Sequence, residues 1–550
     1  MDSSKKEIIE YDNIEYITEK DQYDKVVLIG FAHEEDKLEK EVFKLPPCDI
    51  IAPNAFKDYE SKNFIINPKT SILSEGAFKD YKTDAGLKPP HPSSVNFVVS
   101  KDEKTVFWIN PEIEDLVIPE GIESIKFPSN GYNVFGKITK ENIKTKSITF
   151  PKSLKLIGFR VFAEMPELET VHFPEQNENE LELGSESFTK CRKLKLLTIP
   201  KNVTMYDGVF SNCSSLKVLT CDAKQIPASA FENCEELTQV FLSNTEAIHS
   251  NAFAQCRMFS MDFPDTLDTI ERGAFKNNPN LGRIELKDKI YMIGAAAFEN
   301  CVNLEIVNGL EKVSNLKERA FNNTNITFVS LNNTLKYLGQ AVFANCRSLT
   351  HVSINSDVEI FDILYGCKNI NMVMLENATG ISNKAFADVP MSEIYFPSSR
   401  TTLGLSIFGT ASIGEVNMSD MNMDYFTKGH FKGASIDTLV MPRRLSGILD
   451  SSLFDTKINN LIVYTNRITR DNGILDLSFS QANINNLILI GKMTKEDLFN
   501  MTSCDCNINN IFVNLNEEIK SVNGIDVRPL GDCVNLFNFR KSNKFLAEER

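Results

Sequence analysis

The sequence is poor in the residues that most catalytic and metal sites need. It has only 6 His in 550 residues, and these are scattered at positions 33, 91, 172, 249, 351 and 430. No C-x-x-C pair, P-loop, G-x-G-x-x-G or G-x-S-x-G motif occurs, and the CDC at 504–506 has no His nearby. A metal site needs converging ligands, and a cysteine nucleophile needs a base within hydrogen-bond reach. We therefore predict no enzymatic activity and no catalytic, cofactor-binding or metal-binding residues.

The sequence also lacks a basic surplus and long apolar runs. Acidic residues outnumber basic ones by 74 to 59, and the net charge of −15 argues against binding to nucleic acid. Apolar runs such as LILI at 487–490 are far too short to span a bilayer. The N-terminus shows no apolar stretch of the secretory type. We expect a cytoplasmic protein with reduced thiols; a place on the cell surface would require an unconventional route.

What the sequence has in abundance is repetition. Near-copies of one pentapeptide read VFSNC at 209–213, AFENC at 230–234 and 297–301, and VFANC at 342–346. With the Phe as position zero, the motif gives 16 units between 162 and 499, at a mean spacing of about 22.5 residues. The units are centred on Phe162, Phe188, Phe210, Phe231, Phe253, Phe275, Phe298, Phe321, Phe343, Leu364, Phe386, Phe408, Phe431, Phe454, Phe479 and Phe499.

Each unit also carries the alternation of one short strand. Apolar residues lie nine and eleven positions after the Phe, as in Leu197 and Ile199, and the side chain between them points the other way. A proline often follows and ends the strand. A third aliphatic residue, such as Ile226, lies five positions before the Phe. Because no unit could bury these residues alone, we predict stacked coils that form a solenoid with a parallel sheet.

Seven cysteines share the position three residues after the Phe. Other units place Met, Asn, Thr, Val or Ala there, so the position favours a small, mostly apolar side chain. We interpret the thiols as structural; disulfides between adjacent coils are the alternative. The seven are Cys191, Cys213, Cys234, Cys256, Cys301, Cys346 and Cys367.

Stretches such as LKLLTIPKNVTMYDGVFSNCSSLKVL and LDTIERGAFKNNPNLGRIEL resemble the leucine-rich repeats of BspA-like proteins. The resemblance covers residues from about 51 to 515. It implies an α/β leucine-rich-repeat solenoid with about 22–23 residues per coil and a parallel sheet on the concave face. The family looks like surface or secreted proteins used in adhesion and host contact. Adhesion is therefore the alternative to an intracellular interaction scaffold.

The repeat also indicates how the chain is divided. We predict an N-terminal cap at 1–50, the solenoid at 51–515 with a hairpin and loop insertion around 79–134, and a C-terminal cap and polar tail at 516–550. Within the insertion, residues 96–109 read as a hairpin, and we expect its Trp108 to serve packing. After Phe386 the strand begins about one residue earlier, and Cys disappears from the motif.

The outward strand positions are the candidate binding site, because they line the concave sheet. An exposed apolar stripe often marks an interface, so we predict that a protein partner of unknown identity, or a second copy, binds there. The alternatives are that the chain's own tail covers the stripe, or that the strand register slips by one residue. The predicted residues are Met374, Tyr395, Asn417, Val440, Ile462, Ile488 and Phe512, with Glu393 and Glu415 in the neighbouring row.

Overall fold

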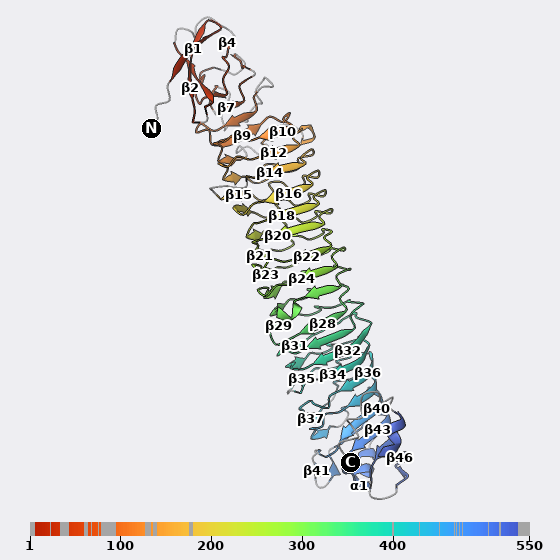
Figure 1. The fold of residues 1–550 in the computed structure, drawn as a ribbon. Coiled ribbons are helices and arrows are strands. Elements are labelled where there is room, and N and C mark those ends of the chain that lie inside the picture. Colours follow the sequence, from red (N-terminus) through yellow and green to blue (C-terminus); the bar gives the residue numbers. More distant parts are fainter. Residues whose placement is uncertain are drawn as a thin grey trace. The chain divides into compact units, whose positions relative to one another are not determined.

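The computed structural model of the chain is a parallel β-solenoid (Figure 1). Residue contacts divide it into two units, Met1–Asn278 and Pro279–Arg550, and each unit is a stack of coils. The structure describes residues 6–22, 24–33, 43–59, 64–67, 69–74, 76–78, 95–126, 134–135, 140–174, 180–398, 401–427, 429–449, 452–466, 468, 470–471, 474–475, 477–503, 505–515 and 519–536.

Most coils contain two short strands, whereas the sequence predicted one. After the long strand β16 (Leu196–Ile199), a turn leads to the short strand β17 (Val203–Met205), and a turn with Phe210 leads to the next long strand, β18 (Val218–Cys221). Long strands pair with long strands, and short strands pair with short ones. We call these two systems the long-strand ladder and the short-strand ladder. In the repeat coils from β11 onward, each short strand has only two or three residues, too few to show an alternation in the sequence.

In the first unit, the short-strand ladder begins with an antiparallel meander and continues through parallel strands. It comprises β1 (Glu7–Tyr11), β2 (Ile14–Lys20), β3 (Val26–Phe31), β5 (Ile50–Ile51), β7 (Ile72–Ser74), β8 (Phe97–Val99), β9 (Thr105–Ile109), β11 (Ser124–Ile125), β13 (Leu156–Ile157), β15 (Leu181–Leu183), β17, β19 (Gln225–Ile226), β21 (Ala247–Ile248) and β23 (Thr269–Ile270). The long strands are β4 (Phe43–Lys44), β6 (Phe64–Ile65), β10 (Asp115–Val117), β12 (Ser147–Thr149), β14 (Thr170–His172), β16, β18, β20 (Gln239–Leu242) and β22 (Ser260–Asp262).

In the second unit, the long strands become longer from β32 onward. They are β24 (Arg283–Glu285), β26 (Ile306–Asn308), β28 (Phe328–Leu331), β30 (His351–Ile354), β32 (Ile370–Leu375), β34 (Met391–Tyr395), β36 (Ser412–Asn417), β38 (Ser435–Val440), β40 (Lys457–Tyr464), β43 (Asn483–Ile490), β44 (Asn507–Val513) and β46 (Ile525–Pro529). The short strands are β25 (Met292–Ile293), β27 (Asn315–Leu316), β29 (Tyr337–Leu338), β31 (Glu359–Ile360), β33 (Gly380–Ile381), β35 (Thr402–Leu403), β37 (Tyr425–Phe426) and β39 (Gly447–Ile448). The hairpin β41 (Arg470–Asp471) and β42 (Ile474–Leu475), and β45 (Ser521–Val522), complete the strands.

The repeated Phe side chains stack along the interior of each unit. In the first unit, the ring of Phe210 lies 5.1 Å from that of Phe188 and 5.7 Å from that of Phe231, and the latter pair is inclined by 4°. In the second unit, Phe298 and Phe321 stack at 5.3 Å. The backbone also links these turns, since the N–H of Phe210 donates to the carbonyl of Ala230 at 2.9 Å. The motif therefore supplies the core and a third line of hydrogen bonds between coils.

The Asn of the motif has a backbone role. Two residues after the Phe, the chain adopts the left-handed conformation, with φ of 60° at Asn212, 60° at Asn233 and 62° at Asn300. Asn tolerates this region better than most residues because its short polar side chain can bond locally. The preference for Asn in AFENC thus follows from the geometry of the turn.

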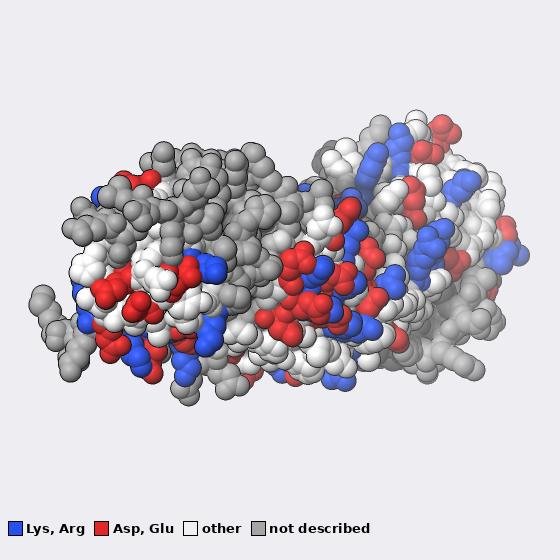
Figure 2. Space-filling view, turned by 90° about the horizontal axis from the view of Figure 1, so that it is seen from above, with Lys and Arg blue, Asp and Glu red and all other residues white. Residues whose placement is uncertain are grey.

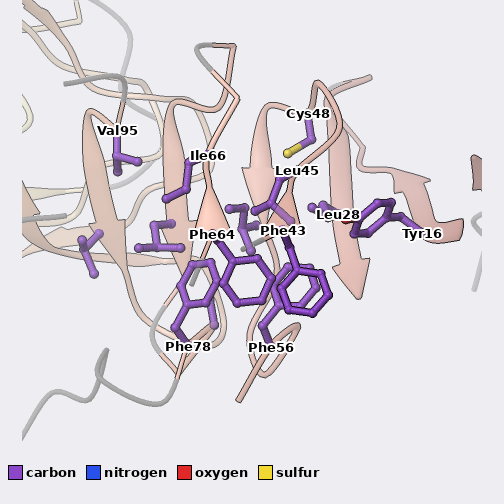
Figure 3. Close-up of a cluster of buried hydrophobic side chains, with 14 of the residues drawn as sticks. Tyr16, Leu28, Phe43, Leu45, Cys48, Phe56, Phe64, Ile66, Phe78 and Val95 are labelled. Carbon is purple, nitrogen blue, oxygen red and sulfur yellow. The ribbon is translucent and has the colours of Figure 1, made fainter. Parts of the chain in front are cut away.

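The N-terminal meander and the first coils share an aromatic core (Figure 3). Phe56 packs against Phe64 at 4.6 Å and against Phe78 at 5.5 Å, and Tyr16 belongs to the same cluster. Trp108 is buried in this cluster, which confirms its packing role. Antiparallel β8 and β9 form the expected hairpin.

Three sequence interpretations lie outside the described residues. They are residues 34–42 of the predicted N-terminal cap, residues 79–94 of the predicted insertion and residues 537–550 of the predicted tail. The domain boundaries proposed from the sequence remain predictions.

Near the C-terminus, two of the predicted repeat positions are wrong. Phe499 lies on the helix α1 (Lys495–Thr502) and is 56% exposed, while Leu498 is buried. Phe454 is only half-buried, and Leu453 takes the interior position. At Phe499 a helix replaces the turn and buries Leu498, and at Phe454 a shift of one residue buries Leu453. The spacing of the Phe residues alone reveals neither change.

Charged side chains of both signs are interspersed on the face shown in Figure 2. Ion pairs also link adjacent coils of the first unit: Lys146 Nζ lies 2.7 Å from Glu114, and Lys195 Nζ lies 2.8 Å from Glu169. Because such pairs are solvated, they favour the register of neighbouring coils more than they stabilise the fold.

Candidate functional site

The long-strand ladder of the second unit brings the predicted site residues together. Direct pairing along successive strands gives one row of Met374, Tyr395, Asn417, Val440, Ile462, Ile488 and Phe512. Glu393 and Glu415 pair with each other in the neighbouring row. The residues that follow or precede them in the strands, such as Ile394 and Leu461, are fully buried. The outward register predicted from the sequence is therefore correct.

The predicted exposure of this row is wrong for much of its length. Met374 is 37% exposed, and Tyr395 and Ile462 are half-buried. Four other members of the row are buried: Asn417, Val440, Ile488 and Phe512. The continuous exposed apolar stripe expected from the sequence does not exist in the described part of the chain.

The chain's own C-terminal segment accounts for the burial at the end of the row. The 3-10 helix η6 (Leu530–Leu536) packs on β43 and β44. Its Leu530 and Cys533 form a buried cluster with Ile488 and Phe512. The alternative that the chain's own tail covers the stripe is therefore confirmed for Ile488 and Phe512.

The polar members of the two rows form a hydrogen-bonded group. The hydroxyl of Tyr395 donates to Glu393 Oε2 at 3.1 Å, and Asn417 Nδ2 donates to Glu415 Oε1 at 3.1 Å. Burial, and then the nearby charges of Glu393 and Glu415, raise the pKa of Tyr395 to about 12. Burial also raises the pKa of Glu415. The Tyr395 hydroxyl therefore keeps its proton and remains a donor at neutral pH.

Sequence reasoning missed the most exposed apolar residues on this face. Phe328 on β28 is 61% exposed, and Ile306 on β26 is 45% exposed. Phe328 lies two residues before Ser330 on the same strand, and Ser330 pairs through Ser353 with Met374, the first residue of the row. Ile306 lies at the equivalent position on β26. The signal was present, because a second outward position exists on each long strand and can be read by the same alternation.

The repeat cysteines do not form a reactive site. All seven are buried, and none of these seven forms a disulfide bond. The thiol of Cys234 donates to the carbonyl of Phe210 in the preceding coil at 3.4 Å, and Cys367 bonds to Phe343 in the same way at 3.2 Å. Burial raises the pKa of each of these two thiols to about 12, so the nucleophilic thiolate is scarce at neutral pH.

Two polar residues keep this hydrogen bond where Cys is absent, namely Asn278 and, three residues after the interior Leu453, Thr456, whereas the Met, Val and Ala of other units have no donor. The amide of Asn278 donates to the carbonyl of Phe253 at 2.8 Å, and the hydroxyl of Thr456 donates to that of Phe431 at 3.1 Å. Cys, Asn and Thr share a hydrogen-bond donor. The sequence interpretation recognised a small side chain but missed this function.

Among the described residues, no group of three or more His, Cys, Asp or Glu side chains is placed to hold a metal ion. No helix within the described ranges is long and apolar enough to cross a membrane.

Comparisons with known proteins were made by sequence and by structure. A family model described as "BspA type Leucine rich repeat region (6 copies)" matches residues 103–238, 246–363 and 360–472. No curated protein matches the chain.

Several solved structures are similar in fold. A leucine-rich repeat protein from Bacteroides ovatus is 19% identical, with 74% of this chain and 94% of that chain covered and a TM-score of 0.42. A leucine-rich cell surface protein from Faecalibacterium prausnitzii is 12% identical, with 90% and 98% covered and a TM-score of 0.31. The pneumococcal vaccine antigen PcpA is 17% identical, with 70% and 93% covered and a TM-score of 0.32.

Proposed function

Because the chain belongs to the BspA type leucine-rich repeat family, we propose that it is a non-enzymatic scaffold that binds another protein. The binding surface is the outer face of the long-strand ladder, the face predicted to be concave. Stacked repeats present a regular surface of this kind, on which side chains from many coils can contact one partner.

The observation that carries this proposal is the exposure of large apolar side chains on that face. Phe328 is 61% exposed, Ile306 is 45% exposed and Met374 is 37% exposed, although each lies on a hydrogen-bonded strand. Single exposed apolar residues are common, but several gathered on adjacent coils indicate an interaction site. Self-association through the end of the row is less favoured, since Ile488 and Phe512 are covered within the chain.

The test is affinity capture from the source cells with the wild-type chain and two variants. The double substitution Ile306→Ser and Phe328→Ser should remove the captured partner, because it takes two apolar anchors from the surface. Phe159→Ser, at a residue that is 56% exposed beyond β13 in the first unit, is the matched control and should retain the partner. If the double variant is folded and captures the same proteins as the wild type, the proposal is wrong.

We propose that this scaffold lies in the cytoplasm; the repeat cysteines support this, because they form no disulfide bonds and reducing compartments keep thiols in that state. Adhesion at the cell surface is the competing function. Fractionation of the source cells, combined with labelling of intact cells by a membrane-impermeant reagent, separates the two. Labelling on intact cells would contradict the cytoplasmic assignment.

A further inference from the structure

Three exposed apolar residues of the second unit, Ile306, Phe328 and Met374, lie on neighbouring coils, and the half-buried Met372 lies on the same strand as Met374. Phe328 on β28 pairs with His351 on β30, which pairs with Met372 on β32, and Met374 lies two residues further along the same strand. The N–H of Asn325 donates to the carbonyl of Leu304 at 3.0 Å, so the coil of Ile306 adjoins that of Phe328. We call Ile306, Phe328, Met372 and Met374 the apolar patch.

Two carboxylates border this patch. Glu393 pairs directly with Met372, and Glu415 pairs with Glu393 on the next coil. Paired positions in a sheet are about 4.8 Å apart, and like charges at such positions destabilise it. Within the described part of the chain, no Lys or Arg forms an ion pair with either carboxylate. This arrangement is electrostatically unfavourable in the free protein.

Each of the two carboxylates is held by a hydrogen bond from a neighbouring side chain but can accept further hydrogen bonds. Tyr395 engages one oxygen of Glu393, and Asn417 engages one oxygen of Glu415. Since a carboxylate has two oxygens and about four acceptor sites, each can accept further hydrogen bonds from a charged donor. Both side chains are half-buried, so an incoming cation would be partly shielded from water, which strengthens its attraction.

Resting on the proposed function, we propose that the partner docks through a basic amphipathic segment. Its apolar side chains cover the apolar patch, and an Arg or Lys side chain binds between Glu393 and Glu415. A guanidinium suits this place because its five donors can serve two carboxylates at once. A second copy of the chain fits less well, because the net charge is −15 and the border of the patch is itself acidic.

The experiment measures the binding of two fluorescent synthetic peptides by anisotropy. Both are 16-residue amphipathic helices with the same Leu face; one carries Arg and the other Glu at the polar positions. The protein is the full chain as wild type, as Phe328→Ser, and as the double variant Glu393→Gln and Glu415→Gln. The control is the double variant Glu235→Gln and Glu359→Gln, which removes two exposed carboxylates away from the patch.

We expect the Arg peptide alone to bind the wild type. Phe328→Ser and the Glu393/Glu415 variant should each weaken binding roughly tenfold or more, as for residues at the centre of an interface. The control variant should retain wild-type affinity, and added salt should weaken binding further.

Three results would overturn the inference. If both peptides bind equally and Phe328→Ser weakens both, the face binds apolar partners without regard to charge, and the proposed function survives. If the control variant weakens binding as much as Glu393→Gln with Glu415→Gln, the attraction is only the overall charge. If neither peptide binds and sedimentation shows dimers that Phe328→Ser disrupts, the occupant is a second copy. Failure of the proposed function would be seen in the other experiment, if the Ile306→Ser and Phe328→Ser variant captured the same proteins as the wild type.

Discussion

The stacked Phe side chains offer the sharpest test of how this fold is held together. Phe231 is fully buried, and its ring lies 5.7 Å from that of Phe210 and 5.4 Å from that of Phe253. The substitution Phe231→Ala removes the ring and leaves a cavity between two coils. The backbone bond from this residue to Ala252 does not involve the side chain and is retained.

The expected loss is about 4 kcal/mol in the free energy of unfolding. Replacing a buried Phe by Ala costs about 3–5 kcal/mol, and the two ring contacts place this site toward the upper part of that range. In a stack of repeats each coil contacts only its neighbours, so the loss should fall on the coils around residue 231. A loss of 4 kcal/mol corresponds to an increase of nearly a thousandfold in local opening.

Hydrogen exchange followed by mass spectrometry measures this effect segment by segment. Peptides from 200–260 should lose close to three orders of magnitude of protection, and those from 300–345 should change little. The control is Phe328→Ala, at an exposed residue, where we expect a change within about 0.5 kcal/mol. Protection that falls less than about tenfold in 200–260, or equally in both segments, would refute the reasoning.

Three further predictions concern the thiols and the C-terminal cover. Cys234→Ala removes the donor to the Phe210 carbonyl and should lower the free energy of unfolding in urea by about 1 kcal/mol, more than Cys234→Thr, which keeps a donor. The Cys234 thiol should react with a thiol reagent only in denaturant. The free energy of unfolding should fall as pH rises from about 9 to about 12, because the pKa of this thiol is near 9.0 in the unfolded chain and about 12 in the folded one. A chain that ends at Pro529 should expose Ile488 and Phe512, bind more hydrophobic dye and associate at high concentration.

Each of these has an opposing result. Equal stability of the Ala and Thr variants of Cys234 would show that the thiol hydrogen bond contributes nothing. Rapid labelling of native protein, or an alkaline slope that Cys234→Ala leaves unchanged, would contradict the assignment of a buried, protonated thiol. Unaltered dye binding by the shortened chain would mean that η6 does not cover the face in solution.

The periodic part of the fold could be predicted because its physics is local and repeated. Each Phe must be buried, each turn favours Asn or Gly in the left-handed conformation, and each long strand alternates. These rules reappear about every 22 residues, so a position that is ambiguous in one unit can be assigned by comparison with the other units. The prediction failed at Phe454, where the interior position moves by one residue to Leu453, and at Phe499, where a helix replaces the turn.

The sequence by itself determined the repeat, the register of the outward row and the proximity of Glu393 to Glu415. Those features follow from the alternation of side chains along strands and from a coil length that varies little between neighbouring coils. Only the tertiary structure decided which outward residues face water. Leu530 and Cys533 belong to no repeat, yet they bury Ile488 and Phe512, whereas Phe328 lies beneath no such cover. Burial depends on what packs above a side chain, and residues distant in the sequence supply that cover without any periodic signal.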